Sequence, residues 1–296
     1  MSGEVVGQAV NAVLAPPQAE RFAAVAGVDL SRLVLNVTGW NKLVLLDCDR
    51  VFLFPRSAIG VEWFERELAA YRALAKTQLD VVPRLLGCWE DPEIYPFPFA
   101  AVTRLRGEVP AEPEALIEQL GQVIACWHEL KPPALAGARP PRHHDAAHHR
   151  WLRRALDPAT SADAAAEAAD RLGRPGRASA WADLLASAAQ LAPVLVHGDI
   201  HEDQLLAEGG QLTGIIDWET ARVDHPFWDF GLWRRRRRDL SVLWAQEWRA
   251  YAQARGLDIG SRPLETAFRL RHALGLLADR GDPAVVGTIE EHLACI

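Results

Sequence analysis

The sequence predicts an α+β protein with two lobes, a β-rich amino-terminal lobe and a larger, mostly helical carboxy-terminal lobe. Short runs of β-branched and aromatic residues, separated by turn signals, occupy most of the chain between residues 33 and 102. From residue 115 onward, apolar residues instead recur with helical spacing. A chain of 296 residues can also bury two cores. We therefore expect one lobe over residues 1–104 and the other over residues 105–296.

The amino-terminal lobe should contain a small antiparallel sheet and one main helix. Residues 62–75 show helical periodicity, with Leu68 and Tyr71 near one face. A proline-rich turn at 91–98 separates the last two strands from each other. The expected strands are residues 33–37, 43–46, 51–54, 87–89 and 99–102.

The carboxy-terminal lobe should be helical apart from two short strands at Leu195 and Ile215. Pro132 to Pro141 is rich in proline and alanine, which predicts an exposed connection. The expected helices are residues 115–130, 164–172, 181–191, 240–254 and 264–278.

Composition and charge exclude several classes of protein. The formal net charge of −7 argues against general binding of nucleic acid or anionic membrane, whereas a cationic ligand would be tolerated. The first residues lack the basic and apolar regions of a signal peptide, and no apolar run reaches the roughly 20 residues of a membrane helix. No C-x-x-C pair occurs, so the four cysteines should be reduced and mostly packed. We expect a cytoplasmic monomer or homodimer.

Two further clusters have ordinary explanations. The arginine run 234–238 could suggest nucleic acid, but it lacks interleaved aromatic residues and is better explained by a charged helix. The histidines at 143, 144, 148 and 149 have only Asp145 as a nearby carboxylate, so a zinc site is a weaker hypothesis than a solvated linker.

The chemistry is concentrated in one stretch and the strand after it. An apolar run ends in His197-Gly198-Asp199, Gln204 follows five residues after Asp199, and Asp217 follows a β-branched strand. Phosphoryl transfer needs a carboxylate that orients the attacking hydroxyl, and oxygen ligands for Mg²⁺ at the nucleotide phosphates. Asp199, Gln204 and Asp217 occur in the order that kinase sites require, although Gln204 replaces the usual asparagine. The spacing therefore indicates a kinase.

Each of these residues also has a simpler explanation. Asp199 could be a solvated loop residue or a helix N-cap, and Asp217 could end a strand in a turn. Gln204 could lie on a helix surface, because glutamine is a fair helix former. His197 is expected to hold the loop by hydrogen bonds, and His201 could do the same or face the substrate.

Together, LVHGDIHEDQLL, GIIDWETA and HPFWDFG resemble the aminoglycoside phosphotransferase family, which includes related antibiotic, choline and homoserine kinases. The resemblance is strong over 194–231, moderate over 34–102 and limited to helix pattern elsewhere. It implies a protein-kinase-like fold in which ATP or GTP, with Mg²⁺, binds between a β-rich lobe and a helical lobe.

The resemblance also implies roles for individual residues. Asp199 matches the catalytic aspartate, Gln204 the metal-binding asparagine and Asp217 the metal-binding aspartate. Asp229 matches a residue that supports the loop, and Glu67 matches the helix glutamate that pairs with a strand lysine. The segment Thr103-Arg104-Leu105 resembles the hinge against which adenine packs.

The nucleotide side departs from the family at one position. The family usually has Lys or Arg two residues before the proline of the third strand, and this chain has Leu53 there. Arg56, Arg50 or Lys42 could supply the charge from another position.

A turn and three carboxylates complete the expected site. Gly39, Asn41 and Lys42 lie in a turn that could cover the phosphates or be an ordinary hairpin. Asp203, Glu219 and Asp224, with His201, lie near the acceptor site in sequence and could receive the ammonium groups of a cationic acceptor.

Three functions remain open. The first is an ATP- or GTP-dependent kinase of a hydroxyl on a small cationic molecule, with an antibiotic as first candidate. The second is a degenerate kinase fold that binds a nucleotide or small molecule without turnover, which Leu53 and Gln204 motivate. The third is a kinase of a primary metabolite such as choline or a sugar.

Overall fold

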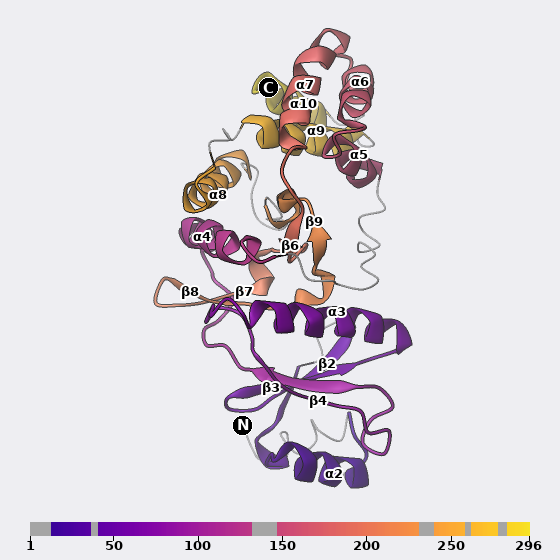
Figure 1. Cartoon of the computed structure of the whole chain (residues 1–296), viewed down its shortest axis with the longest axis vertical. Coiled ribbons are helices and arrows are strands. Elements are labelled where there is room, and N and C mark those ends of the chain that lie inside the picture. Colours follow the sequence, from indigo (N-terminus) through magenta and orange to yellow (C-terminus); the bar gives the residue numbers. More distant parts are fainter. Residues whose placement is uncertain (1–12, 37–40, 132–146, 231–239, 258–261, 278–282) are drawn as a thin grey trace. The chain divides into compact units, whose positions relative to one another are not determined.

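The computed structural model describes residues 13–36, 41–131, 147–230, 240–257, 262–277 and 283–296 (Figure 1). They form two compact units. The first contains the described residues up to Pro113 together with Glu202–Ala221, and the second contains those of Glu114–His201 and Arg222–Ile296. The segment with Gln204 and Asp217 thus belongs to the first unit, and the lobe boundary between residues 104 and 105 stays a prediction.

The first unit is built on a five-stranded antiparallel sheet, and the expected strands of the amino-terminal lobe are confirmed. In β2 and β3, Val44 lies opposite Leu53 and Lys42 opposite Pro55. In sheet order the strands are β1 (Val34–Asn36), β2 (Lys42–Leu46), β3 (Arg50–Pro55), β5 (Phe99–Thr103) and β4 (Leu85–Trp89).

The two faces of this sheet carry different helices (Figure 1). Phe52 and Phe54 of β3 pack edge-on against Phe22 of α2 (Pro16–Ala26), at ring distances of 5.1 and 5.6 Å. Because side chains alternate along a strand, Leu53 points to the opposite face, where α3 (Ala58–Leu74) lies. Helix α2 was not predicted.

Helix α3 is the main helix of the first unit and begins four residues before the predicted start. Ser57 caps it, since its side chain accepts a hydrogen bond from the Gly60 N–H at 3.2 Å. The apolar side chains of Phe64 and Leu68 are buried, and so are Glu67 and Tyr71. The helix thus carries an acidic residue into the interior of the unit.

A hairpin from later in the chain completes the first unit. It consists of β7 (Leu205–Glu208) and β8 (Gln211–Ile215), between the 3₁₀ helices η5 (Glu202–Gln204) and η6 (Trp218–Thr220). Glu108 and Ala207 exchange two backbone hydrogen bonds of 3.1 and 2.9 Å. Gly107 permits this approach because its φ is +94°, and a Cβ there would lie 2.6 Å from the Ala207 carbonyl oxygen. The hairpin is therefore fixed to the segment that follows β5.

Among the described residues, the second unit is helical apart from one antiparallel strand pair. The strand at Leu195 was predicted but its partner at Arg222–Asp224 was not, and the predicted strand at Ile215 lies in the first unit. Helices α5 and α10 were not predicted. Its core contains six fully buried tryptophans, Trp127, Trp151, Trp181, Trp228, Trp244 and Trp248. Its elements are α4 (Ile117–His128), α5 (Ala147–Ala155), α6 (Ser161–Arg171), α7 (Ala178–Ala188), β6 (Val194–Val196), β9 (Arg222–Asp224), α8 (Leu240–Arg255), α9 (Arg262–Leu276) and α10 (Pro283–Ala294). Further 3₁₀ helices are η1 (Leu30–Arg32), η2 (Pro113–Leu116), η4 (Pro175–Arg177) and η7 (Pro226–Asp229).

Two predictions about single residues are wrong. All four cysteines are free but exposed, so most of them do not pack in a core. His149 is not part of a solvated linker, because it lies in α5 and stacks on Trp228 at 5.9 Å with only 8% of its surface exposed. His143, His144, Asp145 and the arginine run 234–238 lie outside the described residues.

The part of the chain that the structure describes contains no helix that could span a membrane and no group of three or more typical metal ligands. Its helices are too short or too polar to cross a bilayer. Within the same residues, no three or more His, Cys, Asp or Glu side chains are grouped as ligands of a metal ion.

Candidate functional site

The expected site residues are divided between the two units, and Gly39 lies outside the described residues. Those in the first unit are Asn41, Lys42, Arg56, Glu67, Thr103, Leu105, Asp203, Gln204, Asp217 and Glu219. Those in the second unit are His197, Asp199, His201, Asp224 and Asp229.

In the first unit, one ammonium group lies among three carboxylates. Lys42 Nζ is 2.5 Å from Glu67 Oε2 and 2.7 Å from Asp217 Oδ1. It is also 3.4 Å from Glu219 Oε2. The side chains of Lys42 and Glu67 are only 11% and 1% exposed, whereas that of Asp217 is 32% exposed. The sheet, α3 and η6 thus place a buried ion pair beside a carboxylate that solvent can reach.

Burial and charge together set the protonation of this cluster. Burial alone would lower the pKa of Lys42, but Asp217, Glu67 and Glu219 outweigh it and raise that pKa above its ordinary value. Burial raises the pKa of Glu219 to about 7, with Asp217 and Glu67 adding to the rise and Lys42 opposing it. Lys42 is therefore charged at neutral pH, and Glu219 can take a proton near neutral pH.

Of the three cations considered in place of Leu53, Lys42 is the one that contacts Glu67. Val44 pairs with Leu53, and Lys42 lies two residues further along β2, so Lys42 and Leu53 point to the same face of the sheet. The other two candidates lie elsewhere. Arg50 bonds to the Ala26 carbonyl oxygen at 2.9 Å, and exposed Arg56 donates to the Lys42 carbonyl oxygen at 3.3 Å. An ammonium from the start of β2 therefore lies on the face of the sheet that Leu53 also faces.

Gln204 and Asp217 are brought together at the end of the hairpin. Gln204 Nε2 donates to Asp217 Oδ2 at 3.0 Å, and the Ile216 N–H donates to the Gln204 carbonyl oxygen at 2.9 Å. Asp217 has a φ of +68°, a left-handed conformation that Asp tolerates better than most residues. The chain thus turns sharply after β8, where a carboxylate and a carboxamide meet.

Glu219 also binds Asn41, the residue directly before β2. Asn41 Nδ2 donates to Glu219 Oε1 at 2.7 Å, while Glu219 Oε2 faces Lys42. Glu219 is therefore a neighbour of the residues expected to contact nucleotide, although its sequence position suggested the acceptor side.

The segment after β5 contains Leu105, whose backbone makes no hydrogen bond within the described residues. The Thr103 N–H donates to the Arg84 carbonyl oxygen, and the Arg104 N–H donates to that of Asp49, at 2.9 and 2.8 Å. The backbone of Leu105 has no hydrogen-bond partner within the described residues. A flat ligand with its own donors and acceptors could pair with Leu105 there.

In the second unit, Asp229 fixes the loop that carries Asp199. Asp229 Oδ1 accepts from the Gly198 N–H at 2.8 Å, and Oδ2 accepts from the His197 N–H at 3.1 Å. Oδ2 also accepts from Trp127 Nε1 at 3.1 Å and lies 3.0 Å from His128 Nε2. Asp229 is only 1% exposed, so these donors satisfy a buried carboxylate.

The ionisation of this group follows from its partners. Burial would raise the pKa of Asp229, but His128, His197 and the Gly198 N–H lower it overall. Burial lowers the pKa of His128. A neutral His128 therefore donates from Nε2 to the carboxylate, and its Nδ1 accepts from the Tyr251 hydroxyl at 3.0 Å.

Asp199 lies directly after this fixed turn. Gly198 has a φ of +81°, which turns the chain, and the Asp199 N–H donates to His197 Nδ1 at 3.3 Å. His197 is fully buried, as its expected structural role requires. His201 Nε2 lies 4.0 Å from Asp199 Oδ2. The loop thus holds a carboxylate beside an imidazole.

Asp224 and Asp203 are the remaining residues expected to bind the acceptor. Asp224 Oδ2 accepts from Arg222 Nε at 2.7 Å, and Oδ1 accepts from the His225 N–H at 2.8 Å. Both oxygens therefore have internal partners. Asp203 lies in η5, beside Gln204 in the sequence.

The donors of the first unit fit Mg²⁺ by their chemistry. A hard cation prefers carboxylate and amide oxygens, which Asp217 and Gln204 supply from adjacent turns. Three formally negative side chains around one ammonium also leave an excess of negative charge for a dication.

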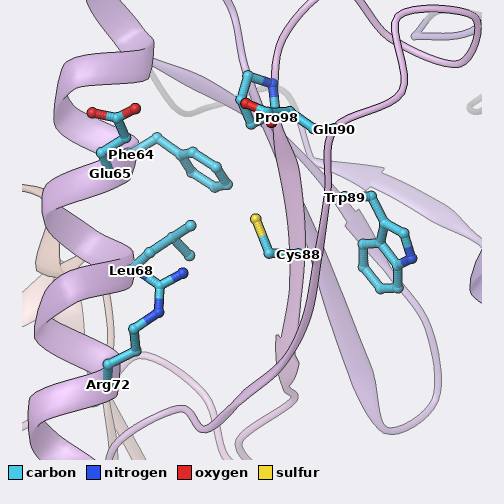
Figure 2. A pocket seen from close by; sticks show the side chains of 8 residues that line it. All are labelled: Phe64, Glu65, Leu68, Arg72, Cys88, Trp89, Glu90 and Pro98. Atoms are coloured by element: carbon cyan, nitrogen blue, oxygen red, sulfur yellow. The ribbon is translucent and has the colours of Figure 1, made fainter.

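A separate cavity of about 410 Å³ lies between α3 and β4. Figure 2 shows Phe64 and Leu68 of the helix on one side and Cys88 of the strand on the other. Its lining also includes Arg72, and none of its eight lining residues belongs to the expected site.

Reasoning from the sequence missed several residues around the site. Tyr71 lies four residues after Glu67, a spacing that could have suggested contact on one helix face. Trp127, His128 and Tyr251 contact the site or its support from distant segments, and no local pattern marks them.

A model of a known protein family matches most of the chain. The family model described as the phosphotransferase enzyme family (APH) matches residues 38–268. No curated protein matches the chain.

Solved structures share the fold at low sequence identity. The aminoglycoside phosphotransferase APH(2'')-IIa, in a ternary complex with streptomycin and ATP, has a TM-score of 0.57 and 14% identity, over 95% of this chain and 96% of that one. The GDP complex of aminoglycoside 2'-phosphotransferase-IIIa has a TM-score of 0.55 and 18% identity, over 95% and 99%. The macrolide 2'-phosphotransferase MphH from Brachybacterium faecium, as apoenzyme, has a TM-score of 0.54 and 21% identity, over 92% and 96%.

These likenesses confirm the kinase-like fold expected from the sequence. The family match covers more than half of the chain. The chain therefore belongs to the phosphotransferase enzyme family.

Proposed function

We propose that this protein transfers the γ-phosphoryl group of ATP or GTP to a hydroxyl group of a small molecule, with an antibiotic as the first candidate. Asp199 orients the acceptor hydroxyl and accepts its proton, which requires an approach to about 3 Å. Lys42 contacts the nucleotide phosphates, and Asp217 and Gln204 hold Mg²⁺. The proposal includes a cytoplasmic location and no nucleic-acid partner.

The observation that carries the proposal is the buried pair between Lys42 and Glu67, with Asp217 at 2.7 Å from the same ammonium group. A phosphoryl-transfer site works mainly by positioning and by stabilising negative charge. An ammonium fixed by a buried glutamate, next to an accessible aspartate, provides both. When bound, Mg²⁺ would neutralise charge on the phosphate oxygens.

Two further features support a nucleotide. The backbone of Leu105, in the expected hinge, has no hydrogen bond within the described residues, as an adenine or guanine contact would need. Asn41, which is next to Lys42 in the sequence, donates a hydrogen bond to Glu219. We assign Thr103, Leu105, Asn41, Arg56 and the turn residue Gly39 to the nucleotide side.

The acceptor is proposed more broadly. Similar structures are described with streptomycin and kanamycin, and others are macrolide phosphotransferases. Two of the three carboxylates expected to bind a cationic acceptor, Asp224 and Glu219, have internal partners. The first test should therefore include both aminoglycosides and macrolides.

The degenerate-kinase alternative is weaker than the sequence alone suggested. Leu53 motivated it by removing a cation from β3, but Lys42 presents an ammonium on the same face of the sheet. Gln204 is its remaining support, because its carboxamide bonds to Asp217. A choline or sugar kinase has no specific support: the described tryptophan beside Asp224, Trp228, is buried and already faces Arg222 at 5.1 Å.

The proposal is tested by phosphate transfer to a panel of acceptors. Purified protein is incubated with γ-labelled ATP or GTP, Mg²⁺ and aminoglycosides, macrolides, choline and sugars. We expect acceptor-dependent labelling that Asp199→Asn abolishes while leaving the thermal unfolding curve unchanged. Labelling that persists in Asp199→Asn would contradict the assignment of Asp199.

A further inference from the structure

The carboxylate of Glu67 has a different partner on each oxygen. Its Oε2 faces Lys42 Nζ at 2.5 Å, and its Oε1 accepts a hydrogen bond from the Tyr71 hydroxyl at 2.7 Å. Glu67 and Tyr71 are 1% and 2% exposed, so bulk water does not compete for either oxygen. Tyr71, one turn further along α3, therefore donates to the Glu67 oxygen that does not face Lys42.

The Tyr71 hydroxyl keeps its proton and so remains a hydrogen-bond donor to Glu67. Burial raises the pKa of Tyr71, and the negative charge of Glu67 raises it further. The phenol therefore stays protonated at every pH at which a kinase works. Residues four apart on a helix lie on one face, so the contact needs no change in the backbone of α3.

The Lys42 ammonium faces three carboxylates, and its position affects how strongly it pairs with Asp217. The ammonium lies 2.7 Å from Asp217 Oδ1 and 3.4 Å from Glu219 Oε2. Glu67 and Asp217 therefore share the ammonium, at 2.5 and 2.7 Å. If Glu67 held it less firmly, Lys42 would pair more strongly with Asp217, in competition with Mg²⁺.

We propose that Tyr71 is a positioning residue for the phosphoryl-transfer site: its hydroxyl fixes the Glu67 carboxylate so that Glu67 shares the Lys42 ammonium with Asp217 and limits its competition with a metal for Asp217. This inference rests on the proposed function. No part of it requires Tyr71 to touch nucleotide or acceptor.

Tyr71→Phe removes the hydroxyl and keeps the ring. Glu67 Oε1 then lacks its donor in a buried place, so the carboxylate rotates or takes a proton and holds Lys42 less firmly. Substitution of residues that support a metal site typically lowers metal affinity by about 10–100-fold. We therefore expect Tyr71→Phe to raise the Mg²⁺ concentration for half-maximal nucleotide binding by about tenfold.

The chain offers a matched control. The Tyr95 hydroxyl donates to the Pro55 carbonyl oxygen at 2.7 Å, in the same unit and at 9% exposure. Tyr95→Phe therefore deletes one buried phenol hydrogen bond of equal length that includes neither Glu67 nor Lys42, and its acceptor Pro55 lies opposite Lys42 in the sheet. A purely structural role for Tyr71 predicts the same result for both variants.

The experiment measures binding of a fluorescent ATP analogue against Mg²⁺ concentration for wild type, Tyr71→Phe, Tyr95→Phe, Glu67→Gln and Tyr71→Phe/Glu67→Gln. We expect a shift in Mg²⁺ dependence for Tyr71→Phe and none for Tyr95→Phe. The double variant should bind no worse than Glu67→Gln alone, because Tyr71 acts only through Glu67.

Two results overturn the inference and can be told apart. If wild type binds nucleotide and the two phenylalanine variants behave alike, or if the effects of Tyr71→Phe and Glu67→Gln add, Tyr71 has no positioning role. If wild type binds no nucleotide at any Mg²⁺ concentration, the proposed function fails and the inference fails with it.

Discussion

Replacing Lys42 by leucine would leave Glu67, Asp217 and Glu219 without the ammonium group that they share. Breaking a buried ion pair costs about 3–5 kcal/mol of stability. The loss should lie near the lower figure, because Asp217 is 32% exposed and Glu219, with a pKa of about 7, can take a proton.

The effect on function should be larger than the effect on folding. A fixed charge that faces the reacting phosphates typically contributes about 10²–10³-fold to turnover. We therefore expect kcat/KM for the nucleotide to fall by about two to three orders of magnitude in Lys42→Leu, with the protein still folded at room temperature. The measurement is steady-state phosphate transfer, with circular dichroism to check the fold.

The register of the sheet provides a sharper test. Leu53 lies opposite Val44 and on the same face as Lys42, so a lysine at position 53 could direct its ammonium into the same cluster. The double variant Lys42→Leu/Leu53→Lys should recover at least about a tenfold part of the lost turnover. Leu53→Lys alone places two ammonium groups on this face and should not raise activity.

The reasoning is refuted if Lys42→Leu keeps wild-type turnover and nucleotide affinity. A double variant that folds but recovers nothing would show that the cluster needs its ammonium to arrive from the start of β2.

Three further predictions concern the loop, the pH dependence of stability and the metal. Asp229→Ala should lower the free energy of unfolding by about 3–5 kcal/mol, because four buried donors lose their acceptor, and urea denaturation measures this. Burial lowers the pKa of His225 to about 4, so the folded protein keeps this imidazole neutral while the unfolded chain binds a proton below about pH 6.5. Stability should therefore fall between pH 6.5 and 4, by about 3 kcal/mol from this residue, and His225→Asn should have a flatter profile by that amount. Gln204→Leu should raise the Mg²⁺ concentration for half-maximal nucleotide binding by about tenfold or more, and an unchanged value would remove Gln204 from the metal site.

The fold was predictable because its elements have strong local signals. The antiparallel strands of the first unit are short apolar runs between turns, and α3, α4, α8 and α9 have helical periodicity. Helices α2, α5 and α10 have 11, 9 and 12 residues, so their formation depends on packing. Phe22 of α2, for example, packs against Phe52, Phe54 and Phe99.

The site was predictable where its residues are close in sequence. Asp199 and Asp217 are marked by spacing within one stretch, and the structure places Asp217 beside Gln204. The sequence left the role of Lys42 undecided. The family pattern gives a position along β3, but it does not show which side chains β2 presents on the same face of the sheet. That information lies in the β2–β3 register.

Contacts between distant segments were beyond the sequence. His128 lies 101 residues before its partner Asp229, and Glu219 lies 178 residues after Asn41. No periodicity or motif links such pairs, so the support of the loop and the position of Glu219 could come only from the structure.

The most direct test of the central claim is transfer of labelled phosphate from ATP or GTP to an acceptor, with wild type and Asp199→Asn measured side by side. The account predicts a phosphorylated acceptor with wild type and a loss of several orders of magnitude in the variant, with nucleotide binding retained. Nucleotide binding by wild type with no transfer to any acceptor, across aminoglycosides, macrolides, choline and sugars, would contradict it.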